Sequence, residues 1–319
     1  MIHFIEQRNN YTTMTQFFII SSSKDKASLN IRDKLLSSEK WEFELLSDHW
    51  FHNALYKLKS FNSSYKRGVA FLEENEVYLG LTSKRLVFLN DLKLENSILD
   101  PDYLVFASRH SSESGKPSFL VHSTGNWSGD LRFGGEKKKL SYTTATGIKA
   151  GFFSLLEGAK ERNVTDFSID VEVTHHGPTR LEIPLIFMEL GSTASQWHHN
   201  EGGLVLANAI IESLIKIIEI QKEGNQKVGI GFGGTHYAPQ FRKLLLDSKE
   251  HIALSFICPK YYIKALNKQL IDQMIQNTVE DVDFFVIDWS GINSAGKKHL
   301  LPLLKEYDIP IKKIKKLRN

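Results

Sequence analysis

Histidine and glutamate side chains gather in one short stretch of this sequence, where two predicted strands end. His175 and His176 follow an alternating apolar and polar run, residues 167–174, and a Gly-Pro pair comes directly after them. Glu189 ends a second apolar run, residues 184–188. Charged side chains are rarely buried unless they are paired or bound to a ligand. Imidazoles and a carboxylate at strand ends can bind a metal or transfer protons, so we interpret this stretch as a functional site rather than as ordinary loop residues.

Other histidines stand in the same position, directly after an apolar run. His110 follows residues 103–107, His122 ends residues 119–122, and His236 lies in a glycine-rich turn after a strand that begins at residue 228. Glycines let backbone amides approach a ligand closely, although this turn has neither the P-loop nor the dinucleotide-binding spacing. The single cysteine excludes a disulfide within the chain and a thiolate zinc site. Any metal ligands must therefore be histidine with aspartate or glutamate.

Composition describes an ordinary globular chain. Its 319 residues can bury a large core, with 41% hydrophobic and 24% charged residues. No apolar run has the length of a membrane span, and the N-terminus lacks the pattern of a signal peptide. The lone, buried cysteine favours a reducing compartment. A net charge of +3 does not indicate whether the protein binds nucleic acid. The lysine clusters at 137–139 and 312–316 are more typical of a solvated surface than of phosphate contacts.

Predicted strands alternate with predicted helices along the chain. This order indicates an α/β fold, a mainly parallel mixed sheet with helices on both faces. We expect residues 1–15 to be an extension and residues 16–319 to form one compound unit, which could be divided into two subdomains. Strands are expected at 17–20, 77–81, 86–89, 103–107, 119–122, 167–174, 184–188, 228–232, 252–257 and 284–287, and helices at 29–36, 142–163, 202–223, 262–277 and 295–307.

Five motifs occur together in a fixed order. They are SRHSS at 108–112, VHSTGN at 121–126, EVTHHGPT at 172–179, ELGST at 189–193 and GFGGTHYAP at 231–239. In this combination the chain resembles the archaeal and plant type of D-aminoacyl-tRNA deacylase, from about residue 16 to the C-terminus. EVTHHGPT together with GGTHYAP is specific, whereas neither alone would be. One departure is Ser255-Phe256, where the family usually has Gly-His, and we interpret that histidine as a supporting residue.

The resemblance implies an esterase that cleaves D-amino acids from tRNA and so guards translation. It also implies a fold similar to phosphorylase and hydrolase α/β proteins, zinc as cofactor with two ions per chain, and a cytoplasmic monomer that contacts no membrane. Zinc held by histidine and carboxylate can lower the pKa of bound water to about 7, and backbone amides of a glycine-rich turn can hold an oxyanion.

We therefore expect the histidines and glutamates to converge on one pocket, with ligand and proton-transfer roles that the sequence does not divide. The catalytic candidates are His175, His176, His110, Glu189 and His236, and the metal candidates are His122, His175, His176 and Glu172. The substrate-binding candidates are Arg109, Thr174, Thr179, Gly233, Gly234, Lys260 and Tyr261. For Arg109, a surface ion pair is as good an interpretation as a contact with the terminal phosphate.

Two other classes of function stay open at this point. A different metal-dependent hydrolase, such as a peptidase, would explain the same residues, and it would act without tRNA. A non-catalytic tRNA-binding protein would bind without turnover and with strong salt dependence. Clustered histidines argue against the second class, because RNA binding alone requires lysine, arginine and aromatic residues.

Overall fold

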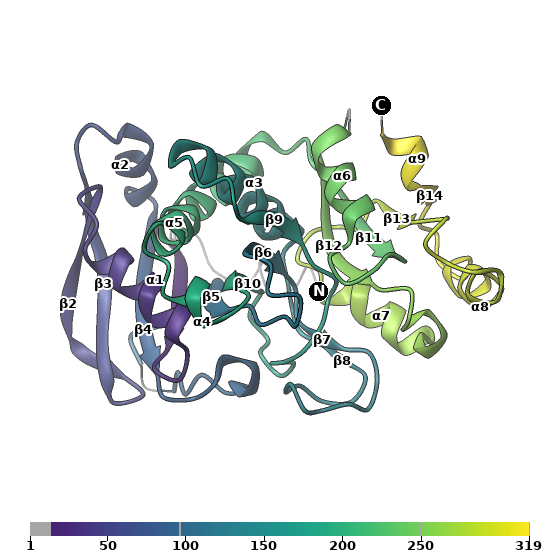
Figure 1. The fold of residues 1–319 in the computed structure, drawn as a ribbon, viewed down its shortest axis with the longest axis horizontal. Coiled ribbons are helices and arrows are strands. Elements are labelled where there is room, and N and C mark those ends of the chain that lie inside the picture. The colour runs from purple at the N-terminus through teal and green to yellow at the C-terminus, as the bar shows by residue number, and fades with distance from the viewer. Residues whose placement is uncertain (1–13, 96, 249, 319) are drawn as a thin grey trace.

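The computed structural model describes residues 14–95, 97–248 and 250–318, and the predicted extension at 1–15 lies almost wholly outside them. In these ranges an eight-stranded sheet spans the left and centre of Figure 1. Strands β4, β1, β5 and β10 run parallel, β2 and β3 form an antiparallel hairpin beside β4, and β6 is antiparallel to β10. The order is β2 (Trp41–Trp50), β3 (Asn53–Phe61), β4 (Asn75–Thr82), β1 (Thr15–Ser22), β5 (Tyr103–Arg109), β10 (Leu185–Gly191), β6 (Ser118–His122) and β9 (Ser168–Val171).

A second, fully parallel sheet of four strands lies on the right of Figure 1. Its order is β12 (Ile252–Cys258), β11 (Lys227–Phe232), β13 (Phe284–Ile287) and β14 (Ile311–Lys313). A small ladder of β7 (Gly125–Asn126) and β8 (Lys139–Leu140) completes the described strands. Most strand pairs are parallel, which confirms the predicted α/β class and the mixed, mainly parallel arrangement.

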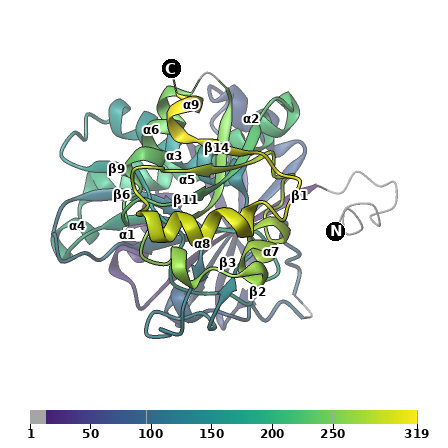
Figure 2. The ribbon, with the colours of Figure 1, turned by 90° about the vertical axis from the view of Figure 1, so that its right-hand side faces the viewer.

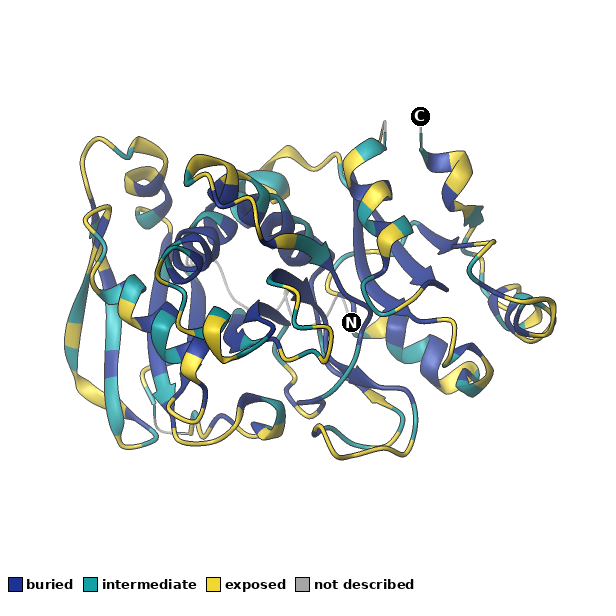
Figure 3. Ribbon diagram, viewed as in Figure 1, coloured by how far each residue is buried: buried dark blue, intermediate teal, exposed yellow. Residues whose placement is uncertain are grey.

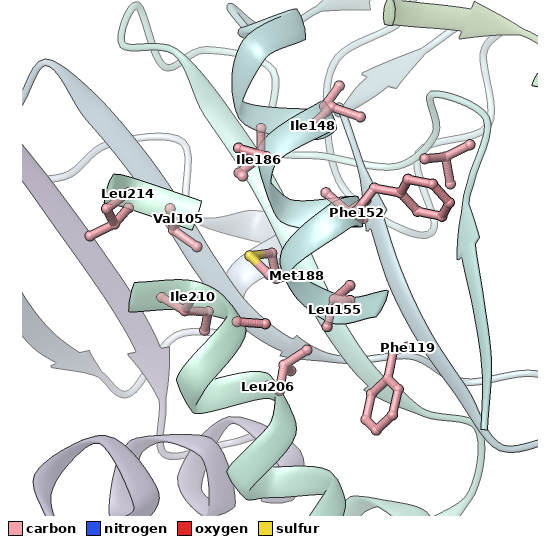
Figure 4. Packing of buried hydrophobic residues seen from close by; sticks show 14 of the residues in the cluster. Val105, Phe119, Ile148, Phe152, Leu155, Ile186, Met188, Leu206, Ile210 and Leu214 are labelled. Carbon is pink, nitrogen blue, oxygen red and sulfur yellow. The ribbon is translucent and has the colours of Figure 1, made fainter. Parts of the chain in front are cut away.

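Three helices cover one face of the large sheet. They are α1 (Lys26–Leu36), α3 (Ala145–Glu161) and α5 (Asn200–Glu223). Figure 4 shows Ile148, Phe152 and Leu155 of α3 and Leu206, Ile210 and Leu214 of α5 packed onto strand residues such as Val105 and Met188. The spacing of three or four residues puts each set on one side of its helix. Asp25 caps α1 and Thr144 caps α3 through their side-chain oxygens.

Loop segments and one short 3-10 helix, not α-helices, cover the opposite face of the large sheet. Residues 86–89 were predicted as a strand, and this prediction is wrong: Leu86–Phe88 forms a short 3-10 helix, η1. Leu86, Leu89 and Leu92 lie at intervals of three and are buried against β1, β5 and β10. A short apolar run is consistent with either a strand or a turn of helix, so the composition of residues 86–89 does not distinguish the two structures.

Helices lie on both faces of the four-stranded sheet. Alternate residues of β13 enter different clusters: Phe284 and Val286 pack with α6 (Pro239–Asp247) and α9 (Ile314–Leu317), whereas Phe285 and Ile287 pack with α7 (Lys268–Gln276) and α8 (Ser294–Leu304). Figure 2 views the α8 side of this sheet. Figure 3 shows buried strands in both sheets and exposed outer helix faces. Among the described residues, none of the helices combines the length and apolar character that a bilayer span requires.

Four helices and one hairpin were not predicted. The helices are α2 (Lys66–Leu72), α4 (Ala194–Trp197), α6 and α9. The helix predicted at 262–277 is instead the 3-10 helix η2 (Ile263–Ala265) followed by α7, which begins at Lys268. The hairpin of β2 and β3 closes one edge of the large sheet, and most of its side chains are partly or fully exposed. An edge strand with polar residues on both faces has no clear apolar alternation, so the sequence gives little signal for it.

Residues 172–176 join the two sheets. The predicted strand 167–174 is regular only over β9, and the chain then crosses to the second sheet. Val173 N donates to the His236 carbonyl at 3.0 Å, and Thr174 N donates to the Ile257 carbonyl at 3.0 Å. The predicted site residues Glu172 and His175 therefore lie at the junction of the sheets.

Candidate active site

Five histidines from four segments meet at this junction. His110 follows β5, His122 ends β6, His175 and His176 follow β9, and His236 lies in the glycine-rich turn after β11. The ring centroid of His175 is 4.3 Å from that of His122, 4.4 Å from that of His176 and 4.6 Å from that of His236. The structure therefore brings the predicted imidazoles into one cluster.

Two buried glutamates complete the cluster. Glu189 on β10 has its carboxylate 3.5 Å from His110 Nδ1, 3.8 Å from His122 Nε2 and 3.9 Å from His176 Nε2. Glu172 has its carboxylate 3.0 Å from His236 Nε2, 3.7 Å from His110 Nδ1 and 3.9 Å from His175 Nε2. Each carboxylate is thus faced by three imidazoles.

Three of the histidines have the same ring orientation. The Nδ1 atoms of His122, His175 and His176 lie 3.0, 2.8 and 2.7 Å from the backbone carbonyls of residues 123, 173 and 177. A carbonyl only accepts a hydrogen bond, so each Nδ1 carries the hydrogen and each Nε2 is directed into the cluster. A neutral ring in this orientation offers the Nε2 lone pair to a metal ion, with its other nitrogen fixed by the backbone.

Burial sets the charge of these rings. It lowers the pKa of His175 well below the ordinary value, and the neighbouring imidazoles add to the shift. Burial also lowers the pKa of His176, against the opposing hydrogen bond of Glu189. Burial disfavours the charged form of His122 too, but Glu189 outweighs it and raises the pKa of that ring. His175 and His176 are therefore neutral near pH 7, the state in which histidine ligates metals.

The donor set fits a divalent cation. Three groups of side chains each place their donor atoms within 4.8 Å of one another: His122 with His175 and His176, Glu172 with His175 and His236, and His110 with Glu172 and Glu189. Both Glu172 carboxylate oxygens and His122 Nε2 are buried without a hydrogen-bond partner. A buried carboxylate without donors is unfavourable. A cation among these atoms would satisfy it, and imidazole nitrogen with carboxylate oxygen is a ligand set that zinc accepts.

His110 differs from the other histidines. Burial alone would lower its pKa, but the hydrogen bond with Glu189 and the charge of Glu172 outweigh burial and raise the pKa to about 9. The same hydrogen bonds hold the pKa of Glu189 well below its ordinary value in spite of burial. His110 Nε2 lies 3.3 Å from the Tyr237 hydroxyl, which donates to Ser112 Oγ at 3.1 Å. His110 is thus a protonated imidazole between the carboxylates and a tyrosine.

Backbone contacts fix His110 from both sides. Asp25 accepts a hydrogen bond from Arg109 N at 2.9 Å, and the Trp197 indole donates to the His110 carbonyl at 2.7 Å. The Arg109 guanidinium lies 5.0 Å from the centre of a Trp197 ring. Sequence patterns alone predict no positioning role for Asp25, Trp197 or Tyr237. For Asp25 a signal existed, since its spacing to Ser28 is that of a helix cap.

The cluster opens into a cavity of about 530 Å³. His110, His175, His176, His236 and Glu189 line it, whereas His122 and Glu172 are buried behind its wall. Two predicted substrate-binding residues also line it, Arg109 and Tyr261. The Tyr261 hydroxyl lies 3.4 Å from His236 Nδ1. An ester carbonyl in this cavity would therefore be beside the exposed imidazoles.

The other predicted substrate-binding residues lie outside the cavity wall. The Thr174 hydroxyl is 2.8 Å from Ser123 Oγ and accepts from Ile257 N at 3.0 Å, and the Thr179 hydroxyl accepts from Glu136 N at 2.8 Å. Both hydroxyls thus have partners within the protein. Gly233 and Gly234 lie in the turn that carries His236, and both have positive φ (+106° and +79°). Lys260 follows β12, and its backbone N donates to the Gly234 carbonyl. Substrate contacts of these five residues stay predictions.

Phe256, which replaces the family's usual histidine, lies away from the cluster. It is fully buried in the apolar core between the four-stranded sheet and helices α7 and α8. Its place in this core supports the interpretation that the position has a supporting role.

Comparison with known proteins places the chain in a family. The sequence profile described as D-aminoacyl-tRNA deacylase matches residues 97–312. The D-aminoacyl-tRNA deacylase of Methanosarcina barkeri is 31% identical over 315 residues, which cover 98% of this chain and 94% of that protein. The D-aminoacyl-tRNA deacylase of Thermococcus onnurineus is 31% identical, with 90% and 96% covered. The match thus extends over nearly the whole chain.

Solved structures agree with the sequence match. The crystal structure of a conserved protein of unknown function is 28% identical and covers 96% of this chain and 98% of its own, with a TM-score of 0.77. Futalosine hydrolase of Helicobacter pylori covers 65% of this chain at 11% identity and a TM-score of 0.35, so the expected likeness to phosphorylase and hydrolase folds stays a prediction. On the profile, the relatives and the shared structure, the chain belongs to the D-aminoacyl-tRNA deacylase family.

Proposed function

We propose that this protein hydrolyses the ester bond of D-aminoacyl-tRNA and releases a free D-amino acid and tRNA. One observation carries the proposal for this chain: five imidazoles and two carboxylates form a cluster that opens into a cavity large enough for a small organic ligand. Family membership gives the substrate class. Hydrolysis of this ester requires an activated water, a polarised carbonyl and a proton for the leaving ribose oxygen.

We assign the metal ligands from the donor atoms. His175 belongs to two of the three groups, and its single free nitrogen binds one ion. Two zinc ions would therefore divide the cluster, one held by His122, His176 and Glu189 and the other by His175, His236 and Glu172. When bound, zinc supplies a Lewis acid that polarises the ester carbonyl and makes water acidic enough to attack near neutral pH. The number and identity of the ions are part of the proposal.

His110 is the residue that moves a proton. Its raised pKa keeps it protonated at neutral pH. Its Nε2 faces Tyr237 near the cavity, while Nδ1 is held by Glu189. From this position His110 gives its proton to the ribose oxygen as the ester breaks, and the two glutamates stabilise its charge before transfer. Arg109 and Tyr261, on the cavity wall, are the substrate contacts that we retain.

The cluster can be formed by the residues of one chain, and we propose that the protein is a monomer. Sedimentation equilibrium tests this proposal. Aminoacyl-tRNA is a cytoplasmic substrate, so we propose the cytoplasm as the compartment, which fractionation tests. Separate expression of a fragment ending before β11 tests whether residues 16–319 are one folding unit.

The decisive assay compares D-tyrosyl-tRNA with L-tyrosyl-tRNA, each labelled in the amino acid. We expect the D form alone to be hydrolysed. A chelator should stop the reaction until zinc is returned.

His176→Ala should abolish turnover while the circular dichroism spectrum stays unchanged. His251→Ala is the matched control, because His251 is exposed. Normal turnover by His176→Ala would contradict the site, and full activity of metal-free protein would remove zinc from the mechanism. Cleavage of peptides without tRNA would favour a peptidase, and binding without turnover an RNA-binding protein.

A further inference from the structure

A large aromatic side chain on the cavity wall has no role in the mechanism described so far. Phe133 lies in the loop between β7 and β8, lines the cavity that the histidines open into, and is 59% exposed. Tyr261, on the same cavity, is 52% exposed. Single exposed apolar residues are normal on a protein surface. Two exposed rings on the wall of an active-site cavity are instead available to a planar ligand.

The loop holds Phe133 close to the reacting residues. The Phe133 carbonyl accepts a hydrogen bond from Gly177 N at 3.0 Å, one residue from His176. Gly134, at φ +77°, packs so closely on Val87 that a Cβ would lie 1.8 Å from the Val87 carbonyl oxygen. Only glycine fits there, so two backbone contacts fix the loop beside His176.

The charges on the cavity wall fit a nucleotide. Lys24, Arg85 and Arg109 line the same cavity, and none of the three has an ion pair with a carboxylate within 4.0 Å in the part of the chain that the structure describes. The carboxylates on the wall are engaged elsewhere: Asp130 pairs with Arg132 and Glu189 faces the histidines, while Asp25 accepts from Arg109 N. Unpaired cations beside exposed rings are the combination that binds single-stranded nucleic acid, through phosphates and stacked bases.

We propose that Phe133 is the stacking platform for the terminal adenine of tRNA, with Tyr261 as a second aromatic surface. The inference rests on the proposed function, because the scissile ester joins the amino acid to the ribose of that adenosine. When the carbonyl lies at His176 and His236, the base is one ribose away and must lie in the same cavity. A volume of about 530 Å³ is within the range of pockets for small organic ligands, roughly 300–1,000 Å³.

The first test is kinetic. Phe133→Ala should raise KM for D-tyrosyl-tRNA about tenfold to a hundredfold, the usual effect of losing one base–aromatic stack, with kcat nearly unchanged. Phe133→Trp should restore KM. Leu131→Ala is the matched control, because Leu131 is 49% exposed in the same loop but does not line the cavity. A fall in kcat without a change in KM would overturn the proposal, since Phe133 would then act only by positioning His176.

The second test needs no hydrolysis. Uncharged tRNA with 2-aminopurine at its terminal position loses fluorescence when that base stacks on a ring. We expect quenching by the wild type, Phe133→Trp and Leu131→Ala, and little quenching by Phe133→Ala at saturating protein. Equal quenching by Phe133→Ala and wild type would overturn the inference. If the wild type quenches through Phe133 but hydrolyses no D-aminoacyl-tRNA, the stacking site stands and the proposed function fails.

Discussion

Glu172→Gln separates a metal ligand from a structural ion pair, because the two roles predict opposite results. Glu172 is buried, with both carboxylate oxygens lacking a hydrogen-bond donor. The substitution keeps the volume and removes one negative charge. The imidazole nitrogens around the carboxylate lie 3.0 to 3.9 Å away, so a cation that these groups would hold lies within about 4 Å of the carboxylate.

The expected loss of metal affinity follows from that distance. Two unit charges at 4 Å attract by about 4 kcal/mol at an effective dielectric constant near 20, so a divalent ion gains roughly 8 kcal/mol. If desolvation offsets half of this, about 4 kcal/mol remains, a roughly thousandfold weaker Kd. In metal-free protein the cost should be about 1 kcal/mol or less, because His110 keeps Glu189 at 3.5 Å and a buried neutral amide costs less desolvation than a buried carboxylate.

Calorimetry on chelator-stripped protein, with and without zinc, measures both quantities. Zinc at about 100 times the wild-type Kd adds about 2.7 kcal/mol, a rise in Tm of roughly 4 °C for a chain of this length. Glu172→Gln should keep the metal-free Tm and lose this rise. Glu76→Gln is the control. Glu76 lies outside the cluster and pairs with Lys57, with 2.6 Å between Nζ and the carboxylate oxygen, so the zinc-induced rise in Tm should remain in this variant. A full zinc-induced rise in Glu172→Gln, or a metal-free loss above about 3 kcal/mol, would refute the reasoning.

Three further predictions concern the same site. The pKa of His110 is raised from 6.5 to about 9, so its contribution to stability is complete below pH 6.5 and is lost as pH rises through 9. Urea unfolding of metal-free protein from pH 6 to 10 should show this loss, on the order of 3 kcal/mol, and His110→Gln should not. Thr174→Val should cost about 1–3 kcal/mol in thermal unfolding, because Ile257 N loses its buried acceptor, whereas Thr174→Ser should cost less than half as much. Trp197→Phe removes the donor to the His110 carbonyl and should lower kcat about tenfold with zinc affinity unchanged by calorimetry; an unchanged kcat would show that this bond does not position His110.

Local sequence pattern determined much of the fold and the membership of the cluster. Strand and helix periods depend on neighbouring residues, so β1, β5, β11, α3 and α5 follow from apolar spacing, and the caps at Asp25 and Thr144 follow from side chains next to helix starts. His110, His122 and His236 could be named because each follows an apolar run. Their meeting did not follow from parallel pairing alone, because β6 runs antiparallel to β10 and β11 belongs to the second sheet.

Tertiary structure alone decided how these parts meet. The crossing of residues 172–174 from one sheet to the other depends on hydrogen bonds to His236 and Ile257, more than 60 residues away, and no local period encodes such a partner. That crossing buries Glu172 and Thr174, which period-two alternation would leave facing solvent. The division between neutral His175 and His176 and protonated His110 likewise depends on burial, which lowers the pKa of the first two rings, and on the two carboxylates that outweigh burial at His110. The sequence by itself determined which residues could do chemistry, and long-range burial and pairing decided the charge and position at which each one does it.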